Sequence, residues 1–154
     1  MVQQLNRLEL WQTVLRQGIF PQLSDEQLTV LRTAFETDDP RLIQGATTTP
    51  LPLLCVRDWP AEAACVLGFC GWVGDELKTV GEVEEFFGKV CFECDRLLGE
   101  PAAVRHLLNW FDDAPRDEMR RLLLKEVWLE HYRRRATVIR VEEACDVPVM
   151  VRMR

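Results

Sequence analysis

The sequence predicts a mainly α fold, a single compact bundle of about six or seven helices with a C-terminal β-strand pair or extended tail. Apolar residues recur at steps of three and four along most of residues 1–135, and an almost wholly apolar segment lies near the middle. Near the end, a two-residue alternation replaces the helical period. The chain of 154 residues has the length of one domain. We therefore expect a helical domain over residues 1–135 and a strand-like tail over residues 136–154.

Helix signals follow one another through the N-terminal part of the chain. Residues 5–17 carry apolar side chains at helical spacing, and a second helix should follow the capping box of Ser24 and Gln27. An Asp-Pro pair predicts a short third helix over residues 39–45. The threonines and prolines of residues 47–60 predict a loop, because proline lacks the amide donor and keeps the preceding residue extended.

The second half begins with the segment that should lie at the centre of the core. Residues 60–72 are apolar and rich in small side chains, which predicts a buried helix. A capping box at residues 79–82 opens the next helix, and two further helices are expected over residues 101–111 and 115–135. Residues 137–141 and 147–153 are rich in valine and isoleucine, so they predict two strands that need a surface to pair with.

Charge and composition narrow the classes of function. The net charge is −6, and it is unevenly distributed: residues 1–115 carry nine Lys/Arg and eighteen Asp/Glu, whereas residues 116–154 carry ten and seven. An acidic body does not resemble a duplex-DNA binder, which would present a strongly basic face. We see no signal-peptide pattern and no apolar run of the ~20 residues that a membrane helix needs, so we expect a cytoplasmic protein without membrane contact.

The six cysteines should then be free thiols, and they are the first candidates for chemistry. Cys91 and Cys94 have a metal-like spacing, but both lie on an apolar helix stripe, where they serve as small core residues. Cys55 lies on the loop, where a nucleophile would still need a nearby base. Phosphate-binding loops, nucleophile elbows and metalloprotease motifs are absent from the sequence, which favours a non-enzymatic protein without a cofactor.

The candidate interaction residues lie in one loop and at the C-terminal end. Trp59, next to a proline on a loop edge, is a candidate interface anchor. The others are basic or β-branched residues of the last quarter of the chain: Arg133, Arg134, Arg135, Arg140, Val149, Val151 and Arg152. Cations at a helix end also interact favourably with the helix dipole, so the run of arginines has a local explanation too.

Three hypotheses follow. The first is a protein-interaction module, a small accessory or inhibitory subunit of a bacterial intracellular complex, which binds another protein or a second copy of itself through the tail. The second is a nucleic-acid accessory protein that uses the arginine-rich end and binds less tightly as salt rises. The third is a thiol or metal-dependent enzyme centred on Cys55 or on Cys91 and Cys94.

Overall fold

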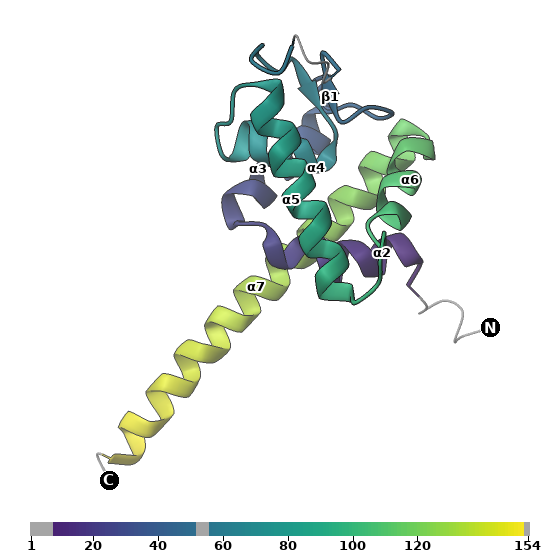
Figure 1. The fold of residues 1–154 in the computed structure, drawn as a ribbon. Helices are drawn as coiled ribbons and strands as arrows, with labels where there is room; N and C mark the ends of the chain where they lie inside the picture. Colours follow the sequence, from purple (N-terminus) through teal and green to yellow (C-terminus); the bar gives the residue numbers. More distant parts are fainter. Residues whose placement is uncertain (1–7, 52–55, 153–154) are drawn as a thin grey trace, which may run out of the picture.

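The computed structural model describes residues 8–51 and 56–152, with side chains up to residue 141, and it is mainly helical as predicted (Figure 1). Two-residue strands β1 and β2 pair antiparallel, Thr48 with Ala64 and Thr49 with Ala63. π-helical turns span Leu15–Ile19 and Cys70–Gly74, and a 3₁₀ turn spans Phe20–Gln22. The α-helices of the described residues are α2 (Leu10–Val14), α3 (Asp25–Thr37), α4 (Val66–Phe69), α5 (Val80–Leu98), α6 (Arg105–Asp113) and α7 (Arg116–Arg152).

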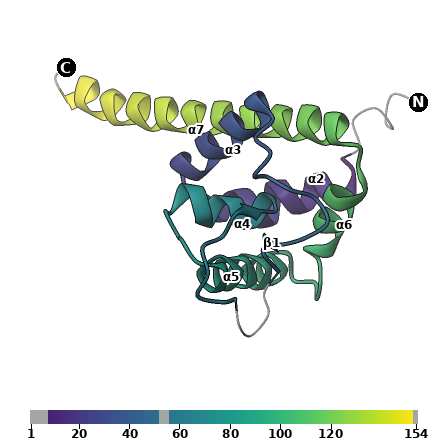
Figure 2. The same cartoon turned by 90° about the horizontal axis from the view of Figure 1, so that it is seen from above.

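The helices lie in layers. Viewed from above, α7 runs along one side of the body and α5 lies on the opposite side, with α2 and α4 between them (Figure 2). α3 packs against α7, the Leu15–Ile19 turn packs against α5, and α2 packs against α6. The largest buried side chains join these layers into one core: Phe20, Phe35, Phe69, Phe111, Ile19, Leu28, Leu31, Leu42, Leu67, Leu107, Met119 and Leu123.

The predicted capping boxes set the starts of α3 and α5. Ser24 Oγ accepts a hydrogen bond from the Gln27 amide at 3.1 Å, and the Gln27 side chain accepts one from the Ser24 amide at 2.8 Å. Thr79 and Glu82 form the same reciprocal pair before α5. These bonds satisfy amides that have no partner inside the helix, so both helix starts follow from the local sequence.

The central segment is buried as predicted, but it is not one helix. Ala63–Ala64 forms β2, and α4 and the Cys70–Gly74 turn follow it. A Cβ atom at Gly71 would lie 2.6 Å from the ring of Phe86 on α5, so the close approach of α5 requires glycine here. The small residues of the central segment therefore let α5 pack closely against it. They also disfavour a long helix within the segment itself.

The predicted short helix over residues 39–45 is wrong. Asp38 has φ of +52°, a left-handed conformation that turns the chain away from α3. The backbone then pairs with β2: the Ile43 amide donates to Ala64 O at 2.9 Å, and the Ala64 amide donates to Arg41 O at 2.8 Å. Bonds to a neighbouring segment replace the helical bonds that the local signals predicted.

The structure does not show the expected C-terminal strand pair, because α7 continues without a break to Arg152. Extending an existing helix adds one hydrogen bond for each ordered residue, whereas two isolated strands need a supporting surface. Residues 136–152, here called the arm, project away from the body (Figure 1). The predicted boundary after Arg135 falls inside this helix, and the division into a domain and a tail stays a prediction.

Candidate functional site

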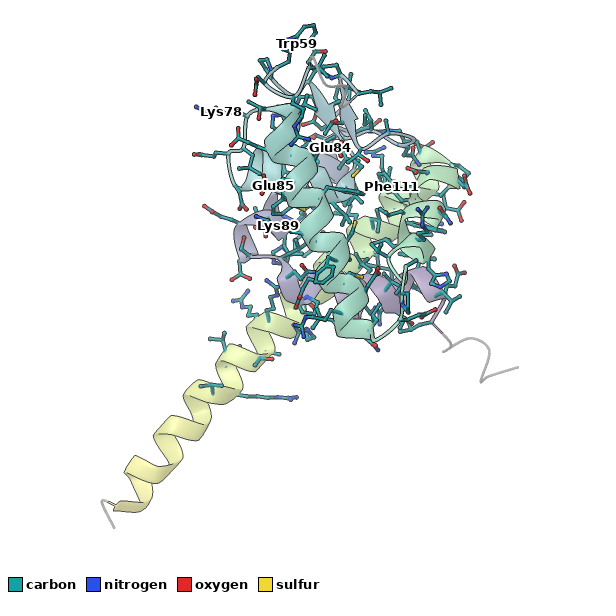
Figure 3. The ribbon with its side chains drawn as sticks, in the orientation of Figure 1. Trp59, Lys78, Glu84, Glu85, Lys89 and Phe111 are labelled. Carbon is teal, nitrogen blue, oxygen red and sulfur yellow. The ribbon has the colours of Figure 1, made fainter. Side chains whose placement is uncertain are left out.

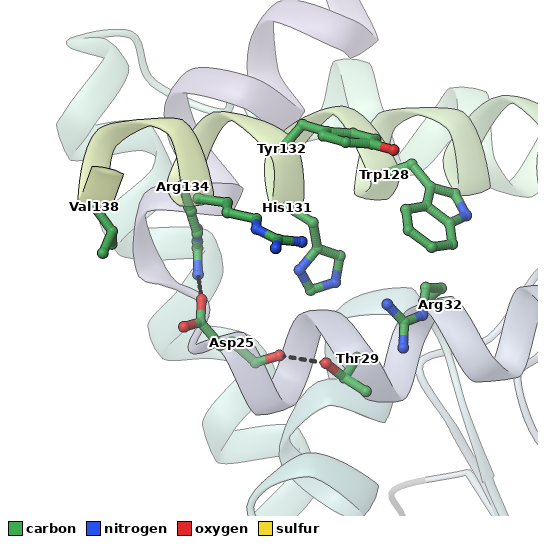
Figure 4. A pocket seen from close by; sticks show the side chains of 9 residues that line it. Asp25, Thr29, Arg32, Trp128, His131, Tyr132, Arg134 and Val138 are labelled. Atoms are coloured by element: carbon green, nitrogen blue, oxygen red, sulfur yellow. Dashed lines mark hydrogen bonds and ion pairs between the residues drawn. The ribbon is translucent and has the colours of Figure 1, made fainter. Parts of the chain in front are cut away.

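Aromatic and basic side chains gather where α3 and α7 separate, and they line a pocket of about 480 Å³ (Figure 4). α3 contributes Asp25, Thr29 and Arg32. α7 contributes Trp128, His131, Tyr132, Arg134, Arg135 and Val138. The pocket thus lies at the point where the arm leaves the body.

The two helices place these side chains through their core-facing residues. Leu28, Leu31 and Phe35 of α3 are buried in the core. The three α3 residues of the pocket recur at steps of four and three, so they share an adjacent face of the same helix. Met119, Leu123 and Val127 anchor α7 in the same way, and the pocket residues follow in the next turns.

Arg134 connects the arm base to the body. Its guanidinium donates to Asp25 Oδ1 at 2.9 Å, to the Phe20 carbonyl oxygen at 2.7 Å and to Glu130 Oε2 at 2.8 Å. Arg133 donates two further bonds to the Glu130 carboxylate, at 2.7 and 2.6 Å. Burial alone would raise the pKa of Glu130, but the hydrogen bonds from both arginines outweigh it and leave the pKa lowered. Glu130 therefore stays ionised and holds both guanidinium groups in place.

Two aromatic rings form the exposed wall of the pocket. The Trp128 side chain is 40% exposed, and the Arg32 guanidinium carbon lies 5.0 Å from its ring centroid. Tyr132 is 66% exposed, with its ring centroid 6.3 Å from that of Trp128. A cation held over an aromatic face gains about 0.5–1 kcal/mol at an exposed site. Together with Arg32, the two rings therefore offer an incoming group both apolar surface and positive charge.

His131 brings a polar atom without a partner to this pocket. Its Nε2 is buried and makes no hydrogen bond with any residue that the structure describes. Burial lowers the pKa of His131, and the nearby Arg32 lowers it further, so the imidazole is neutral at pH 7. A buried polar atom without a partner raises the free energy of the folded protein, so an added donor or acceptor at this point would stabilise it.

The start of the arm exposes apolar side chains at the edge of the pocket and beyond it. Val138, Ile139 and Val141 are 56%, 46% and 57% exposed. Arg135 and Arg140 are exposed on the same turns. Val149, Val151 and Arg152, also predicted as interaction residues, lie on the α7 backbone beyond the described side chains. The structure thus places the predicted arginines of residues 133–140 along one helix next to exposed apolar groups.

Trp59, the remaining predicted interaction residue, lies elsewhere. It is 54% exposed in a turn at the end of the molecule opposite to the arm (Figure 3). Its carbonyl oxygen accepts a hydrogen bond from the Val80 amide at 2.9 Å, which ties the turn to the start of α5. The structure therefore does not bring Trp59 together with the arginines of α7.

Sequence reasoning missed the contribution of α3 and the aromatic wall of the pocket. Asp25 lies 109 positions before Arg134, so no local pattern connects them. Trp128 and Tyr132 did carry a signal, because they are four residues apart and therefore share a helix face. That face differs from the one occupied by the buried Met119, Leu123 and Val127.

The described cysteines lie in the core. Cys65, Cys70 and Cys94 are buried and Cys91 is half-buried, all as free thiols. Among the residues with described side chains, no three His, Cys, Asp or Glu residues are arranged to hold a metal ion. Cys55 lies outside the described residues, so its predicted catalytic role stays a prediction.

Burial should suppress the reactivity of these thiols. It raises the pKa of Cys65 and of Cys94 to about 11 and that of Cys91 to about 12, and it raises that of Cys70 further. We expect alkylation of Cys65 and Cys94 by iodoacetamide at pH 8 to be about 100-fold or more slower in the native protein than in urea. Peptide mass spectrometry over a time course measures both rates. Rapid native alkylation of Cys94 would contradict the protonated, buried state.

Comparison with protein families, with curated proteins and with solved structures gives no match to this chain. Within the described residues, no helix combines the length and the apolar character needed to cross a lipid bilayer. The α3–α7 pocket and the arm are therefore the features of the molecule that indicate a function.

Proposed function

We propose that this protein is a protein-interaction module that binds a partner through the α3–α7 pocket and the adjoining arm. The observation that carries the proposal is the exposed apolar and aromatic surface of α7, with Tyr132 66% and Val138 56% exposed. Trp, Tyr and Arg are the residue types most enriched among residues that dominate binding energy at protein interfaces. An accessory or inhibitory subunit of a larger complex would use such a surface.

The need of a helix for packing along its apolar face supports the proposal that the arm binds a partner. The arm extends α7 beyond the body, and most helical stability in proteins comes from packing of an apolar face. The arm is rich in β-branched residues, which have lower helix propensity than alanine or leucine. A partner that covers Val138, Ile139 and Val141 would supply the missing packing, as in complexes where an amphipathic helix is recognised through its apolar face.

The arginines at the arm base favour a protein over a nucleic acid. Arg133 and Arg134 both bond the buried Glu130, and Arg134 also bonds Asp25. Guanidinium groups already paired with carboxylates contribute little to the phosphate contacts that drive nucleic-acid binding. The nucleic-acid hypothesis stays a prediction, and a binding constant that is insensitive to salt would contradict it.

Replacing Tyr132 by Ala should weaken partner binding about tenfold or more, because a large aromatic anchor is removed from the centre of the surface. Phe92→Ala is the matched control, since Phe92 is 72% exposed on α5, away from the pocket. The measurement has two stages: affinity purification of the tagged full chain from its native host with mass spectrometry, and titration of the purified partner by calorimetry.

The two variants distinguish the proposed surface from the rest of the molecule. Loss of binding in Tyr132→Ala with retention in Phe92→Ala supports the proposal. Equal affinity for wild type and Tyr132→Ala would show that the pocket is not part of the binding surface. Weaker binding in Phe92→Ala alone would indicate that the interface lies on α5.

A further inference from the structure

The α3–α7 pocket holds an excess of positive charge. Arg32, Arg134 and Arg135 line it, against the single carboxylate of Asp25. The guanidinium of Arg134 is already occupied, because it bonds both Asp25 and Glu130. The charges of Arg134 and Asp25 therefore offset each other, and the excess resides on Arg32 and Arg135. In a chain whose net charge is −6, this pocket is a local reversal of sign.

Arg32 keeps its hydrogen-bond donors free. Among the described residues, its one ion pair is with Glu36, whose Oε1 lies 4.0 Å from Arg32 Nε, too far for a hydrogen bond. Its guanidinium carbon lies over the Trp128 ring, and a guanidinium that contacts an aromatic face keeps its in-plane N–H donors available (Figure 4). The side chain is 30% exposed. An incoming carboxylate can therefore reach Arg32 and accept two parallel hydrogen bonds from it.

The pKa of His131 reflects this uncompensated charge. Burial is the largest cause of its lowered pKa, and Arg32 lowers it further. Of the other charged groups that face the imidazole, Arg134 also lowers the pKa, whereas Asp25 and Glu130 raise it by smaller amounts than the two arginines lower it. A positive potential therefore remains at the ring. An anion in the pocket would be stabilised by this potential.

We propose that the pocket binds a carboxylate of the protein partner: an Asp or Glu side chain of the partner bonds the free edge of Arg32, while a neighbouring apolar side chain packs on Trp128 and Tyr132. Arg135 lines the same pocket and adds a second positive charge. This inference rests on the proposed function, because it names the chemistry that the same surface recognises.

The apolar wall favours a protein as the source of the carboxylate. Trp128, Tyr132 and Val138 line the pocket and are 40%, 66% and 56% exposed. An acidic residue next to an apolar one presents a carboxylate and an apolar group together, as this wall and Arg32 require. A nucleic-acid backbone instead engages a series of unpaired cations, and the pocket offers two, on different helices.

Titration of the full chain with N-acetyl-Glu-Phe-amide tests the inference. The chain has two histidines, so proton NMR of the imidazole groups can follow His131 in the pocket, with His106 on α6 as the internal reference. The His131 resonance should shift and saturate with a Kd of about 1–10 mM, and the His106 resonance should stay in place. N-acetyl-Gln-Phe-amide has the same shape without the charge, so it should bind about tenfold or more weakly.

Arg32→Gln identifies the residue that holds the carboxylate. It should weaken binding of the acidic dipeptide about tenfold or more, because the charged donor is lost. Arg135→Gln should weaken it less, up to about fivefold, because an exposed charge is screened by solvent. Arg105→Gln is the matched control, the same exchange at an exposed position of α6 outside the pocket, and should leave the affinity unchanged.

The outcomes separate this inference from the proposed function. A shift of His131 that requires both the carboxylate and Arg32 supports it. Equal affinity for the two dipeptides, equal affinity for wild type and Arg32→Gln, or no shift up to about 20 mM overturns it. Tighter binding of phenyl phosphate than of the acidic dipeptide would show a phosphate site instead. If the dipeptide fails to bind but Tyr132→Ala still loses the protein partner, the proposed function stands and only the recognised group is wrong.

Discussion

Replacing Arg16 by Met is expected to lower the free energy of unfolding by about 3–5 kcal/mol, because it leaves the carboxylate of Glu126 buried without its cation. Glu126 is 2% exposed. Arg16 holds both of its oxygens, with Nε 2.7 Å from Oε2 and Nη2 2.9 Å from Oε1. Gln12 Nε2 adds a third bond at 3.1 Å, but it carries no charge. The same two bonds raise the pKa of Arg16, so its guanidinium stays charged.

Urea denaturation followed by circular dichroism measures the loss. Arg41→Met is the matched control: Arg41 also bonds a carboxylate, that of Asp39 at 2.7 Å, but its side chain is 52% exposed. Breaking that ion pair should cost at most about 1 kcal/mol. Replacing both Arg16 and Glu126 by Met should recover most of the stability, since no buried charge remains. Equal losses for Arg16→Met and Arg41→Met would show that water reaches Glu126.

The bonds of Arg16 and Arg134 have one structural consequence in common. α7 packs onto the body through Met119, Leu123 and Val127, and the charged pairs at Glu126 and Glu130 then fix its rotation and direction. Bidentate guanidinium–carboxylate contacts are directional, so they specify geometry more than they add stability. The body thereby holds the first half of α7 and sets the direction in which the arm extends.

The sequence predicted the helices whose starts are determined by hydrogen bonds between residues close together in the chain. The starts of α3 and α5 were predicted because each capping box satisfies its own amides within four residues. The segment of residues 39–45 was not, because its backbone bonds go to Ala64, which a local pattern cannot indicate. The alternation of valines over residues 147–151 predicted a strand, but a short β-branched run can also continue a helix that has already formed upstream.

The site was predicted in part for the same reason. The arginines of residues 133–135 were found because a basic run is visible in the sequence. The pocket itself depends on α3, whose Asp25, Thr29 and Arg32 meet α7 only after the core has assembled. Trp128 lies 40% exposed beside Arg32. Long-range packing, not local composition, decides which of these side chains face the pocket.

The second large effect is expected at Trp11, whose replacement by Ala should cost about 3–5 kcal/mol of stability through the cavity it leaves. Trp11 is 4% exposed and stacks on Trp110, with ring centroids 3.7 Å apart and an angle of 6° between the planes. Its indole nitrogen also donates to Glu9 Oε2 at 2.6 Å. The stacked pair joins α2 to α6, so the loss should separate two helices that are distant in sequence.

Circular dichroism should report this unfolding, because the substitution itself changes the tryptophan fluorescence. Trp128→Ala is the matched control: it removes the same side chain from a 40% exposed position, and we expect it to cost about 1 kcal/mol or less. A double-mutant cycle of Trp11→Ala with Trp110→Ala should give a coupling energy of about 0.5–1.5 kcal/mol, the range for paired aromatic rings. A coupling energy near zero would mean that each ring stabilises the fold only through its contacts with the surrounding core. The stacking between α2 and α6 would then be a consequence of packing and not a source of stability.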